Sequence, residues 1–243
     1  MSTLDGKRIL VTGAGSGIGR AAARLFAARG AELVLVGRRL DALRETLPTA
    51  RHVALDHADE TAVATFARDC PPLDGLFLNA GQFASGAVSD TPVAVFDAMW
   101  AANVRGPWLL CHHLGARLRE GGSVVLTGST LGIRAVPGTA AYAVAKAALH
   151  HLARVLAVEW APRGIRCNAI APGPVLTPML QARIDASADP AAMRQALAQV
   201  NPLRRLGREE EIAALAAHLL ADESAWTTGT VIPCDGGATA AAS

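Results

Sequence analysis

The sequence lacks the features that mark a membrane, secreted or metal-binding protein. Its four cysteines are scattered, and no two of them have the CxxC spacing of metal and redox sites. No apolar run is long enough to cross a bilayer. The N-terminus reaches a predicted strand too early to contain a signal peptide. We therefore expect a cytoplasmic protein with free thiols, no metal and no membrane partner.

The chain has little excess charge of either sign, and aromatic residues are scarce. The 243 residues carry a formal net charge of +2, and aromatic residues make up 4% of the chain. There is no basic block and no mixed basic and aromatic patch, so nothing indicates nucleic-acid binding. Hydrophobic residues make up 51%, which is enough to bury a large core, and the length suits one α/β domain over 1–243.

Tyrosine occurs once, at position 142, and its surroundings make it the first candidate for chemistry. Lys146 follows it by four residues in an alanine-rich run that favours helix, so both side chains lie on one helix face. An ammonium group beside a phenol lowers a pKa that is ordinarily about 10. Ser129, just after a predicted strand, can hydrogen-bond the same substrate oxygen. A lone core tyrosine beside a solvated lysine would show the same short motif.

A glycine-rich turn separates a predicted buried strand, 8–12, from a predicted helix. Glycines let backbone N–H groups approach a pyrophosphate, and a helix N-terminus favours anions. The spacing TGxxxGxG differs from the common dinucleotide pattern GxGxxG. In this strand–turn–helix context it predicts nucleotide binding rather than a simple tight turn. The residues predicted to hold the cofactor here are Gly13, Ser16, Gly17, Ile18 and Gly19.

The end of the second predicted strand, 32–37, bears on the choice between NAD and NADP. An acidic residue at this point would bind the ribose hydroxyls of NAD, but here Gly37 is followed by Arg38 and Arg39. Arginine forms forked, charge-assisted hydrogen bonds with a 2′-phosphate. Two solvated arginines are the alternative interpretation. The feature favours NADP, bound through Arg38, and leaves NAD as the second choice.

Turn-forming or polar residues also follow the other predicted strands, at the sheet edge where open α/β sheets bind ligands. Asp56 either accepts a hydrogen bond from an adenine amino group or stabilises a turn. His57 is either a neighbour of the cofactor or a surface histidine. The remaining residues expected to contact the ribose, the nicotinamide carboxamide or a phosphate are Asn79, Ala80, Gly81, Pro172, Gly173, Val175 and Thr177.

Two long stretches complete the pattern. A helix is predicted from residue 91 to about residue 120, with a kink at Gly106-Pro107. Within it, Asn103 is either a satisfied core amide or a break in the helix that holds a water. Residues 178–207 are long for a connection, which predicts a lid over the substrate. Small and apolar side chains in the expected substrate wall suggest a neutral, moderately apolar substrate, and its one arginine can meet an acidic group. Ordinary loop packing is the alternative interpretation. The residues of this wall are Ser85, Arg134, Val136, Met179, Leu180 and Ile184.

In this order and spacing, the motifs resemble the short-chain dehydrogenase/reductase family over nearly the whole chain. The resemblance implies a single-domain, doubly wound Rossmann fold of the α/β class, with a seven-stranded parallel sheet and helices on both faces. It implies a nicotinamide cofactor and a homotetramer, with interfaces at the helices around 109–118 and 139–160 and at the C-terminal segment. The motifs that carry it are the glycine turn, Asn79-Ala80-Gly81, Asn103, Ser129, Tyr142-x3-Lys146 and Pro172-Gly173.

The resemblance also implies a role for each candidate. Tyr142 is expected to act as the general acid/base, and Ser129 to orient the substrate oxygen. Lys146 is expected to bind the nicotinamide ribose and to lower the pKa of Tyr142. Asn103 is expected to anchor a water that relays protons through Lys146. Members that prefer NADP often carry a basic residue where this chain has Ser16, which counts against NADP.

These features predict an oxidoreductase that transfers a hydride between NADP, or NAD, and a small ketone or secondary alcohol. The segment 198–237 resembles 3-oxoacyl-ACP reductases, which is a more specific alternative. A protein that binds the cofactor and senses its redox state without turnover is an alternative of another class, and a structural oligomer is a third. The intact set of Asn103, Ser129, Tyr142 and Lys146 argues against a sensor, which needs no proton acceptor.

Overall fold

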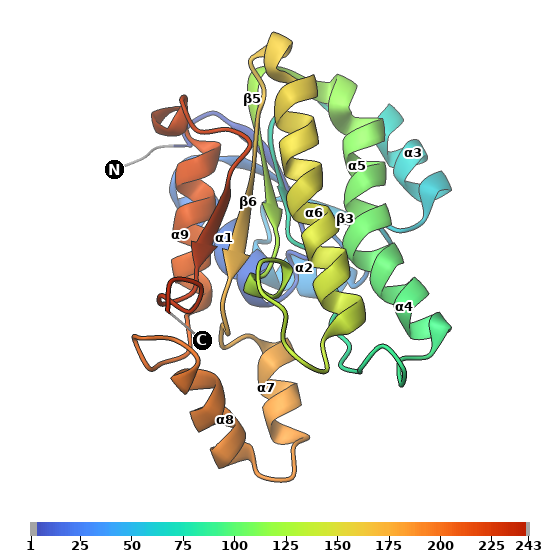
Figure 1. The fold of residues 1–243 in the computed structure, drawn as a ribbon. Helices are drawn as coiled ribbons and strands as arrows, with labels where there is room; N and C mark the ends of the chain where they lie inside the picture. The colour runs from blue at the N-terminus through green and yellow to red at the C-terminus, as the bar shows by residue number, and fades with distance from the viewer. Residues whose placement is uncertain (1–3, 242–243) are drawn as a thin grey trace.

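One parallel β-sheet organises the chain in the computed structural model, which describes residues 4–241 (Figure 1). Within those residues seven strands pair in the order β3-β2-β1-β4-β5-β6-β7, and every pair is parallel. The order reverses between β1 and β4, which is the point where open sheets of this kind bind ligands. The strands are β1 Arg8–Thr12, β2 Glu32–Gly37, β3 Arg51–Ala54, β4 Leu73–Leu78, β5 Leu118–Thr127, β6 Arg166–Pro172 and β7 Val231–Cys234.

Helices cover both faces of the sheet. Helices α3, α5 and α6 lie over one face and α1 and α9 over the other, while α7 and α8 extend beyond the C-terminal ends of the strands (Figure 1). The predicted doubly wound fold is therefore confirmed. The helices are α1 Gly17–Ala28, α2 Leu40–Thr46, α3 Glu60–Arg68, α4 Val93–Trp100, α5 Gly106–Leu114, α6 Ala140–Glu159, α7 Pro178–Asp185, α8 Pro190–Gln199 and α9 Glu209–Leu220.

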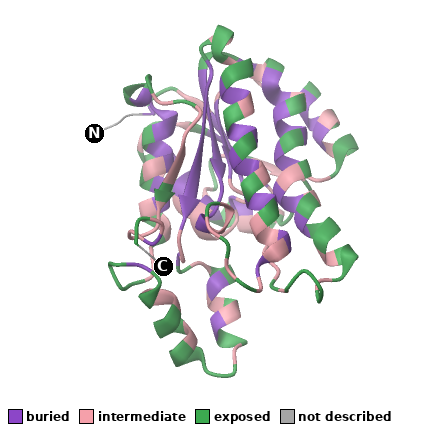
Figure 2. Cartoon of the chain, in the orientation of Figure 1, coloured by how far each residue is buried: buried purple, intermediate pink, exposed green. Residues whose placement is uncertain are grey.

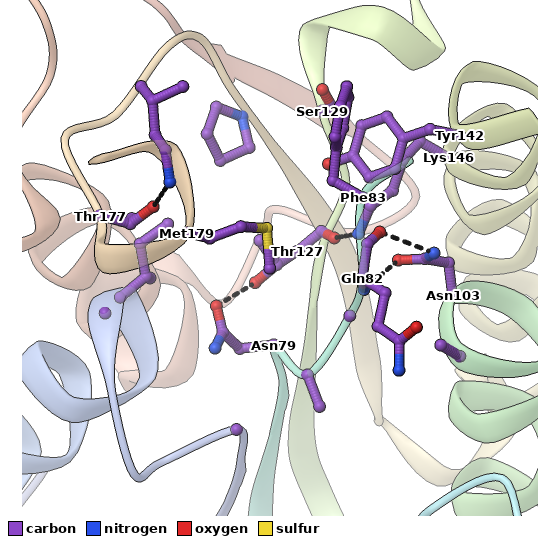
Figure 3. Close-up of a pocket in the computed structure, with 18 of the residues that line it drawn as sticks. Asn79, Gln82, Phe83, Asn103, Thr127, Ser129, Tyr142, Lys146, Thr177 and Met179 are labelled. Atoms are coloured by element: carbon purple, nitrogen blue, oxygen red, sulfur yellow. Dashed lines mark hydrogen bonds between the residues drawn. The ribbon is translucent and has the colours of Figure 1, made fainter. Parts of the chain in front are cut away.

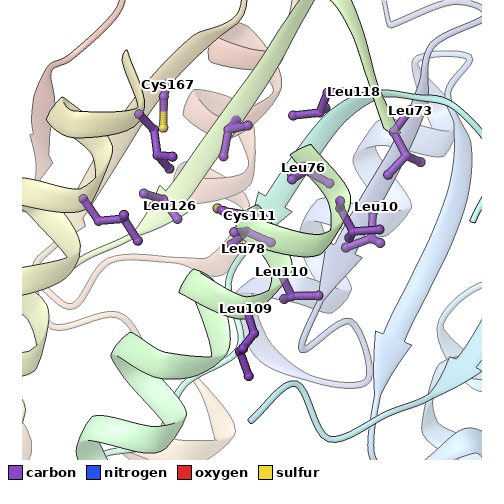
Figure 4. Close-up of a cluster of buried hydrophobic side chains, with 14 of the residues drawn as sticks. Leu10, Leu73, Leu76, Leu78, Leu109, Leu110, Cys111, Leu118, Leu126 and Cys167 are labelled. Atoms are coloured by element: carbon purple, nitrogen blue, oxygen red, sulfur yellow. The ribbon is translucent and has the colours of Figure 1, made fainter. Parts of the chain in front are cut away.

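The five central strands of the sheet are largely buried, as Figure 2 shows by its colour, whereas the edge strands β3 and β7 are partly exposed. Successive strand side chains point to opposite faces. In β1, Leu10 therefore joins the core under α5 and α6, whereas Ile9 and Val11 join the core under α1 and α9. Figure 4 shows the first of these cores, where Leu110 of α5 meets the leucines of β4. Each such fully buried side chain stabilises the fold by roughly 1.5–3 kcal/mol.

The predicted long helix from residue 91 to about residue 120 is wrong in its continuity and at its C-terminal end. The segment breaks into α4, a π-helical turn at Ala101–Arg105 and α5, and β5 begins at Leu118. Leu118 pairs with Leu73, and the register then shifts before the next pairs form. Gly121, with φ of 75°, lies inside this strand instead of ending a helix. The tertiary pairing with β4, which local sequence does not encode, decides the boundary.

The strands predicted at 8–12 and 32–37 have the predicted ends. The apolar run 73–78 also predicts a strand and matches β4, whereas the run 165–170 begins one residue before β6, which extends to Pro172. The four cysteines are free, as predicted. In the described part of the chain, no helix combines the length and apolarity needed to cross a membrane.

Candidate active site

A cavity of about 1320 Å³ lies at the C-terminal ends of the strands. It extends from the glycine turn after β1, past the ends of β4 and β5, to helix α7 (Figure 3). All but one of the predicted catalytic and cofactor-binding residues line it, including Tyr142, whose ring faces the cavity rather than a sealed interior. Residues separated by more than a hundred positions thus share one site, because parallel strands deliver their ends to one edge of the sheet.

The glycine turn has the backbone geometry of an anion cradle. Gly13 and Gly17 have φ of 66° and 58°, which other residues rarely adopt. Ser16 precedes α1 at the N-cap and its side chain makes no capping hydrogen bond, so the first N–H groups of the helix are open to a phosphate. Gly19, which was also predicted to hold the cofactor, supports the turn from below. Gly19 does not line the cavity, because it packs under Gly13, where an added Cβ would lie 2.3 Å from the carbonyl oxygen.

The end of β2 presents two exposed arginines, Arg38 and Arg39, to the same cavity. Asp56, after β3, is the one carboxylate that lines the cavity in the described part of the chain. Its Oδ1 accepts a hydrogen bond from the Ala58 N–H at 3.0 Å, which is the turn-stabilising role. The charge at this end of the cavity therefore suits a 2′-phosphate.

His57 is not the surface histidine that the sequence suggested. It is partly buried and lines the cavity, and its Nε2 lies 2.8 Å from the carbonyl oxygen of Ala102. An added Cβ on Gly106 would lie 1.9 Å from the imidazole Cδ2, so a side chain at 106 would displace the ring. His57 therefore packs against the π-helical turn and its neighbour α5.

Thr12 ties β1 to the turn that follows β4. Its hydroxyl accepts hydrogen bonds from the N–H groups of Asn79 and Ala80 at 2.9 and 3.0 Å. The Asn79 side-chain oxygen accepts a bond from the Thr127 hydroxyl of β5 at 3.3 Å (Figure 3). Three strand ends are thus held together at the switch point of the sheet. Gly81 follows, and an added Cβ there would lie 2.6 Å from Asn103 Oδ1.

Asn103 both interrupts its helix and is satisfied by protein groups. It lies in the π-helical turn and is fully buried. Its Nδ2 donates to the carbonyl oxygens of Gln82 and Met99, each at 3.0 Å, and its Oδ1 accepts from the Gln82 N–H at 3.3 Å. The amide therefore clamps the segment after β4 to the helix. π-Helical turns inside α-helices are often found at functional sites.

Tyr142, Lys146 and Ser129 meet on one wall of the cavity (Figure 3). The Lys146 Nζ lies 5.5 Å from the centroid of the Tyr142 ring and donates to the Thr127 carbonyl oxygen at 2.7 Å. The Ser129 hydroxyl oxygen accepts a bond from the Leu131 N–H at 3.1 Å, which begins a short 3₁₀ turn. The predicted i, i+4 relation on helix α6 is confirmed.

Burial raises the pKa of Tyr142 to about 12, and this contradicts the predicted lowering by Lys146. The groups that oppose the rise are the Ser129 hydroxyl and the charge of Arg183. Burial also lowers the pKa of Lys146 to about 8, because the ammonium form is desolvated. Lys146 directs its Nζ to the Thr127 carbonyl, so in this arrangement the amine holds β5 against α6.

His150 lies one helical turn beyond Lys146 and is a contact that the sequence reading missed. It is buried, and its Nε2 accepts a hydrogen bond from the Ser129 N–H at 3.3 Å. Gly128 makes room for the ring, since an added Cβ there would lie 2.1 Å from Nε2. Burial lowers the pKa of His150 to about 4, with further lowering from Lys146 and Arg154. A neutral imidazole therefore fixes the backbone of Ser129.

Phe83 and Arg183 were also missed. The Phe83 ring packs on Tyr142 with centroids 4.9 Å apart and an interplanar angle of 60°. The Arg183 guanidinium carbon lies 3.9 Å from the Phe83 centroid. Arg183 is one helical turn after Met179, which was predicted to face the substrate, so the i, i+4 rule places both on one face of the helix, although it does not predict the contact with Phe83. Tyr142, Phe83 and Arg183 form a stack, named here the aromatic–guanidinium stack.

Most of the residues expected to form the substrate wall line the cavity. Five of its six residues line the cavity. The exception is Ile184 on the buried side of α7, which is 2% exposed. Arg134 donates from Nη1 to the Ala238 carbonyl oxygen at 2.8 Å, so it also holds the C-terminal segment against the cavity. The residues that do line it are Ser85, Arg134, Val136, Met179 and Leu180.

Comparison with known proteins places this geometry among oxidoreductases. Residues 13–239 match the profile of a family described as enoyl-(acyl carrier protein) reductase. Levodione reductase from Leifsonia aquatica is 38% identical, over 96% of this chain and 94% of that protein. An oxidoreductase from Thermotoga maritima is 37% identical, over 97% and 98% of the two chains.

Solved structures agree with the sequence relatives. The crystal structure of levodione reductase superposes with a TM-score of 0.90 at 37% identity, covering 98% of this chain and 99% of that one. A provisionally assigned NAD(P)-dependent gluconate 5-dehydrogenase from Beutenbergia cavernae, with NADP bound at low occupancy, gives a TM-score of 0.89 at 31% identity over 98% and 99% of the chains.

Proposed function

The chain belongs to the short-chain dehydrogenase/reductase family, and on that premise we propose that it interconverts a ketone and a secondary alcohol with NADP as the preferred cofactor. The observation that carries the proposal is the placement of Tyr142, Ser129 and Lys146 on one wall of the cavity that begins at the glycine turn. A small carbonyl compound against that wall would meet a proton donor and the cofactor at the same time.

The residues of the cavity fit a nicotinamide dinucleotide. Backbone N–H groups of the glycine turn would hold the pyrophosphate, and Arg38 would pair with a 2′-phosphate. Thr177 lines the same end of the cavity near Gly17, and its hydroxyl, which accepts a bond from the Leu180 N–H, still has its own hydrogen to donate to a phosphate. The segment after β6 would hold the carboxamide end through Pro172 and Gly173. When bound, the cofactor supplies or accepts the hydride, and the protein supplies position and charge.

Tyr142 is proposed as the proton donor and acceptor. Its pKa of about 12 keeps the phenol protonated at neutral pH, which suits donation to a carbonyl oxygen during reduction. Ser129, held at its N–H by His150, would present its hydroxyl to the same oxygen. Lys146 would bind the nicotinamide ribose beside the phenol. Asn103 would pass protons by way of a water held near Gln82 and Lys146.

The decisive variant is Tyr142→Phe, which keeps the ring that packs on Phe83 and removes only the hydroxyl. We expect kcat to fall by about 10²–10⁴-fold, the range for loss of a general acid. The affinity for NADPH, measured by fluorescence titration, should remain near that of the wild type. The assay is NADPH oxidation with a panel of ketones that includes a 3-oxoacyl thioester. Activity within about tenfold of wild type would refute the role of Tyr142.

The same assay separates an enzyme from a redox sensor. A sensor would bind NADPH and NADH without turning over any carbonyl in the panel. The side chains that make proton transfer feasible are all present in one cavity, and this arrangement favours the enzyme. Reduction of the thioester alone, with no activity on free ketones, would identify the more specific 3-oxoacyl-ACP reductase activity.

We further propose that residues 178–207 form a substrate lid and that the chain assembles as a homotetramer. Helices α7 and α8 begin at proline residues after Thr177 and Asp189, whose side chains accept bonds from the helix N–H groups. These caps define two short helices beyond the sheet, over the end of the cavity (Figure 1). The tetramer is supported by large apolar side chains exposed on α5 and α6, including Trp108 and Val158.

A further inference from the structure

Arg183, at the substrate end of the cavity, has no acidic partner in the part of the chain that the structure describes. Arg183 projects from α7 onto the Phe83 ring, and no ion pair with Arg183 is formed among residues 4–241. The two stacking distances, 3.9 Å to Phe83 and 4.9 Å from Phe83 to Tyr142, place the guanidinium within the length of a small molecule from the phenol. The charge of Arg183 acts on the Tyr142 hydroxyl at this range.

A second arginine faces the same part of the cavity. Arg134 lines it and is half-buried, and one N–H of its guanidinium is used by the Ala238 carbonyl. A guanidinium has five N–H donors, so donors remain. The one carboxylate among the lining residues that the structure describes, Asp56, follows β3 at the opposite, adenosine end. Lys146 contributes a further positive charge beside the phenol when it is protonated.

This arrangement would be unfavourable for a purely neutral substrate. A partly buried guanidinium without an anionic partner loses hydration and receives only the attraction of an aromatic face, worth about 0.5–2 kcal/mol. A carboxylate from the substrate would form forked, charge-assisted hydrogen bonds with it. The apolar neighbours Val136, Met179 and Leu180 leave room for a short carbon chain between the anion and the reacting carbon.

We propose that the physiological substrate is an oxo acid or hydroxy acid, whose carboxylate is held by Arg183 while its carbonyl or hydroxyl oxygen meets Tyr142 and Ser129. The proposal rests on the proposed oxidoreductase function and deepens it by naming the substrate class. It replaces the expectation of a neutral substrate, in which Arg134 was the one charge considered. Because Arg183 belongs to α7, binding of the anion would also draw the lid toward the aromatic–guanidinium stack.

The test compares acids with their methyl esters, which have the same oxo-acid skeleton and lack the charge. Acetoacetate and 4-oxopentanoate are each assayed against the corresponding ester with NADPH, in the wild type, in Arg183→Met and in Arg194→Met. Arg194 is a matched control, because it lies on the lid helix α8, carries the same charge and does not line the cavity. Arg183→Lys is a second variant, which keeps the charge and loses the fork.

We expect the wild type to prefer the acids over the esters by at least about tenfold in kcat/KM. In Arg183→Met, kcat/KM for the acids should fall by about 30-fold or more, as for loss of a charge-assisted bond. The esters should change by less than about threefold, and Arg194→Met should behave as the wild type. Arg183→Lys should lie between the two.

Two outcomes would overturn the proposal while leaving the proposed function intact. One is equal activity of the wild type on acids and esters. The other is a parallel loss of both in Arg183→Met, which would make Arg183 a structural part of the lid. A binding measurement tests the proposal even if the purified protein shows no turnover. In the presence of NADPH, succinate should raise the melting temperature of the wild type and not that of Arg183→Met. No succinate effect on the wild type would also refute carboxylate binding.

Discussion

Arg38 is the single side chain on which the proposed preference for NADP depends. It is exposed at the end of β2 and lines the cavity, where a forked bond to a 2′-phosphate can form. We expect Arg38→Ala to raise KM for NADPH by about tenfold or more and to change KM for NADH by less than about twofold. Arg44→Ala is the matched control, because Arg44 pairs with Asp41 and does not line the cavity. Equal effects on both cofactors would remove the basis for NADP.

At the same scale, the sequence predicted the polar residues that follow strands and missed those that reach the site from a distance. Ser129 and Asn79 could be predicted because each comes directly after a buried strand, and Tyr142 and Lys146 because of their helical spacing. Arg183 stacks on a phenylalanine a hundred positions earlier, and no local pattern records that contact. The pKa of Tyr142 was predicted in the wrong direction, since burial depends on packing and not on spacing.

At the scale of elements, helix α6 carries Tyr142, Lys146 and His150 at successive turns. Because His150 is buried, we expect the stability of the folded chain to depend on pH. The pKa of His150 lies at about 4 in the folded chain, against 6.5 for an ordinary histidine. Between these values the unfolded chain binds the extra proton, so stability should fall as the pH drops from about 6.5 to about 4, by up to about 3 kcal/mol. Above pH 6.5 the contribution is fully present.

His150→Gln should remove this part of the acid sensitivity, because an amide can bond the Ser129 N–H without titrating. The measurement is the free energy of urea unfolding at several pH values between 4 and 7.5. His151→Gln is the control, since His151 is exposed on the same helix. Its pH dependence should match the wild type. The interpretation fails if His150→Gln keeps the full acid-dependent loss.

Element boundaries could be predicted where the local pattern decides them. The ends of β1, β2 and β4 follow from apolar runs bounded by turns. The start of β5 does not, because Leu118 becomes a strand residue only through its pairing with Leu73. The π-helical turn was foreseen only as a break at Asn103, since an extra residue in a helix leaves no mark in the apolar pattern.

For the whole molecule, the central prediction is assembly through α5 and α6. Trp108, Val144 and Val158 are 55%, 53% and 76% exposed, and the two valines share one stripe of α6 because they are fourteen positions apart. Light scattering coupled to size exclusion should give a particle of four chains for the wild type. Val158→Glu should give smaller particles, because it places charges within an apolar interface. Val88→Glu, on an exposed loop, should leave the tetramer intact.

A wild-type chain that elutes as a monomer would contradict the assembly. The fold itself was predictable at this scale, because alternating strands and helices with glycine turns specify a doubly wound sheet. The proposed lid, 178–207, was predicted by its length and contributes residues to the lining of the cavity, but its arginine could not be placed without the structure. The proposal for the substrate class therefore depends on the segment in which the sequence pattern predicts structure least well.

The π-helical turn has a consequence for how the gene can change. The turn at Ala101–Arg105 contains one residue more than regular helix requires, and its neighbours α4 and α5 are regular α-helices. Loss of a single codon here would leave an unbroken α-helix in which α5 keeps its orientation, because the π-helical turn absorbs the extra residue locally. Asn103 would leave its clamp on Gln82, while the side chains of α5 would keep their places in the hydrophobic core. Deletion of one codon at this point would thus leave the sheet able to fold while it disrupts the arrangement of the catalytic residues at its edge.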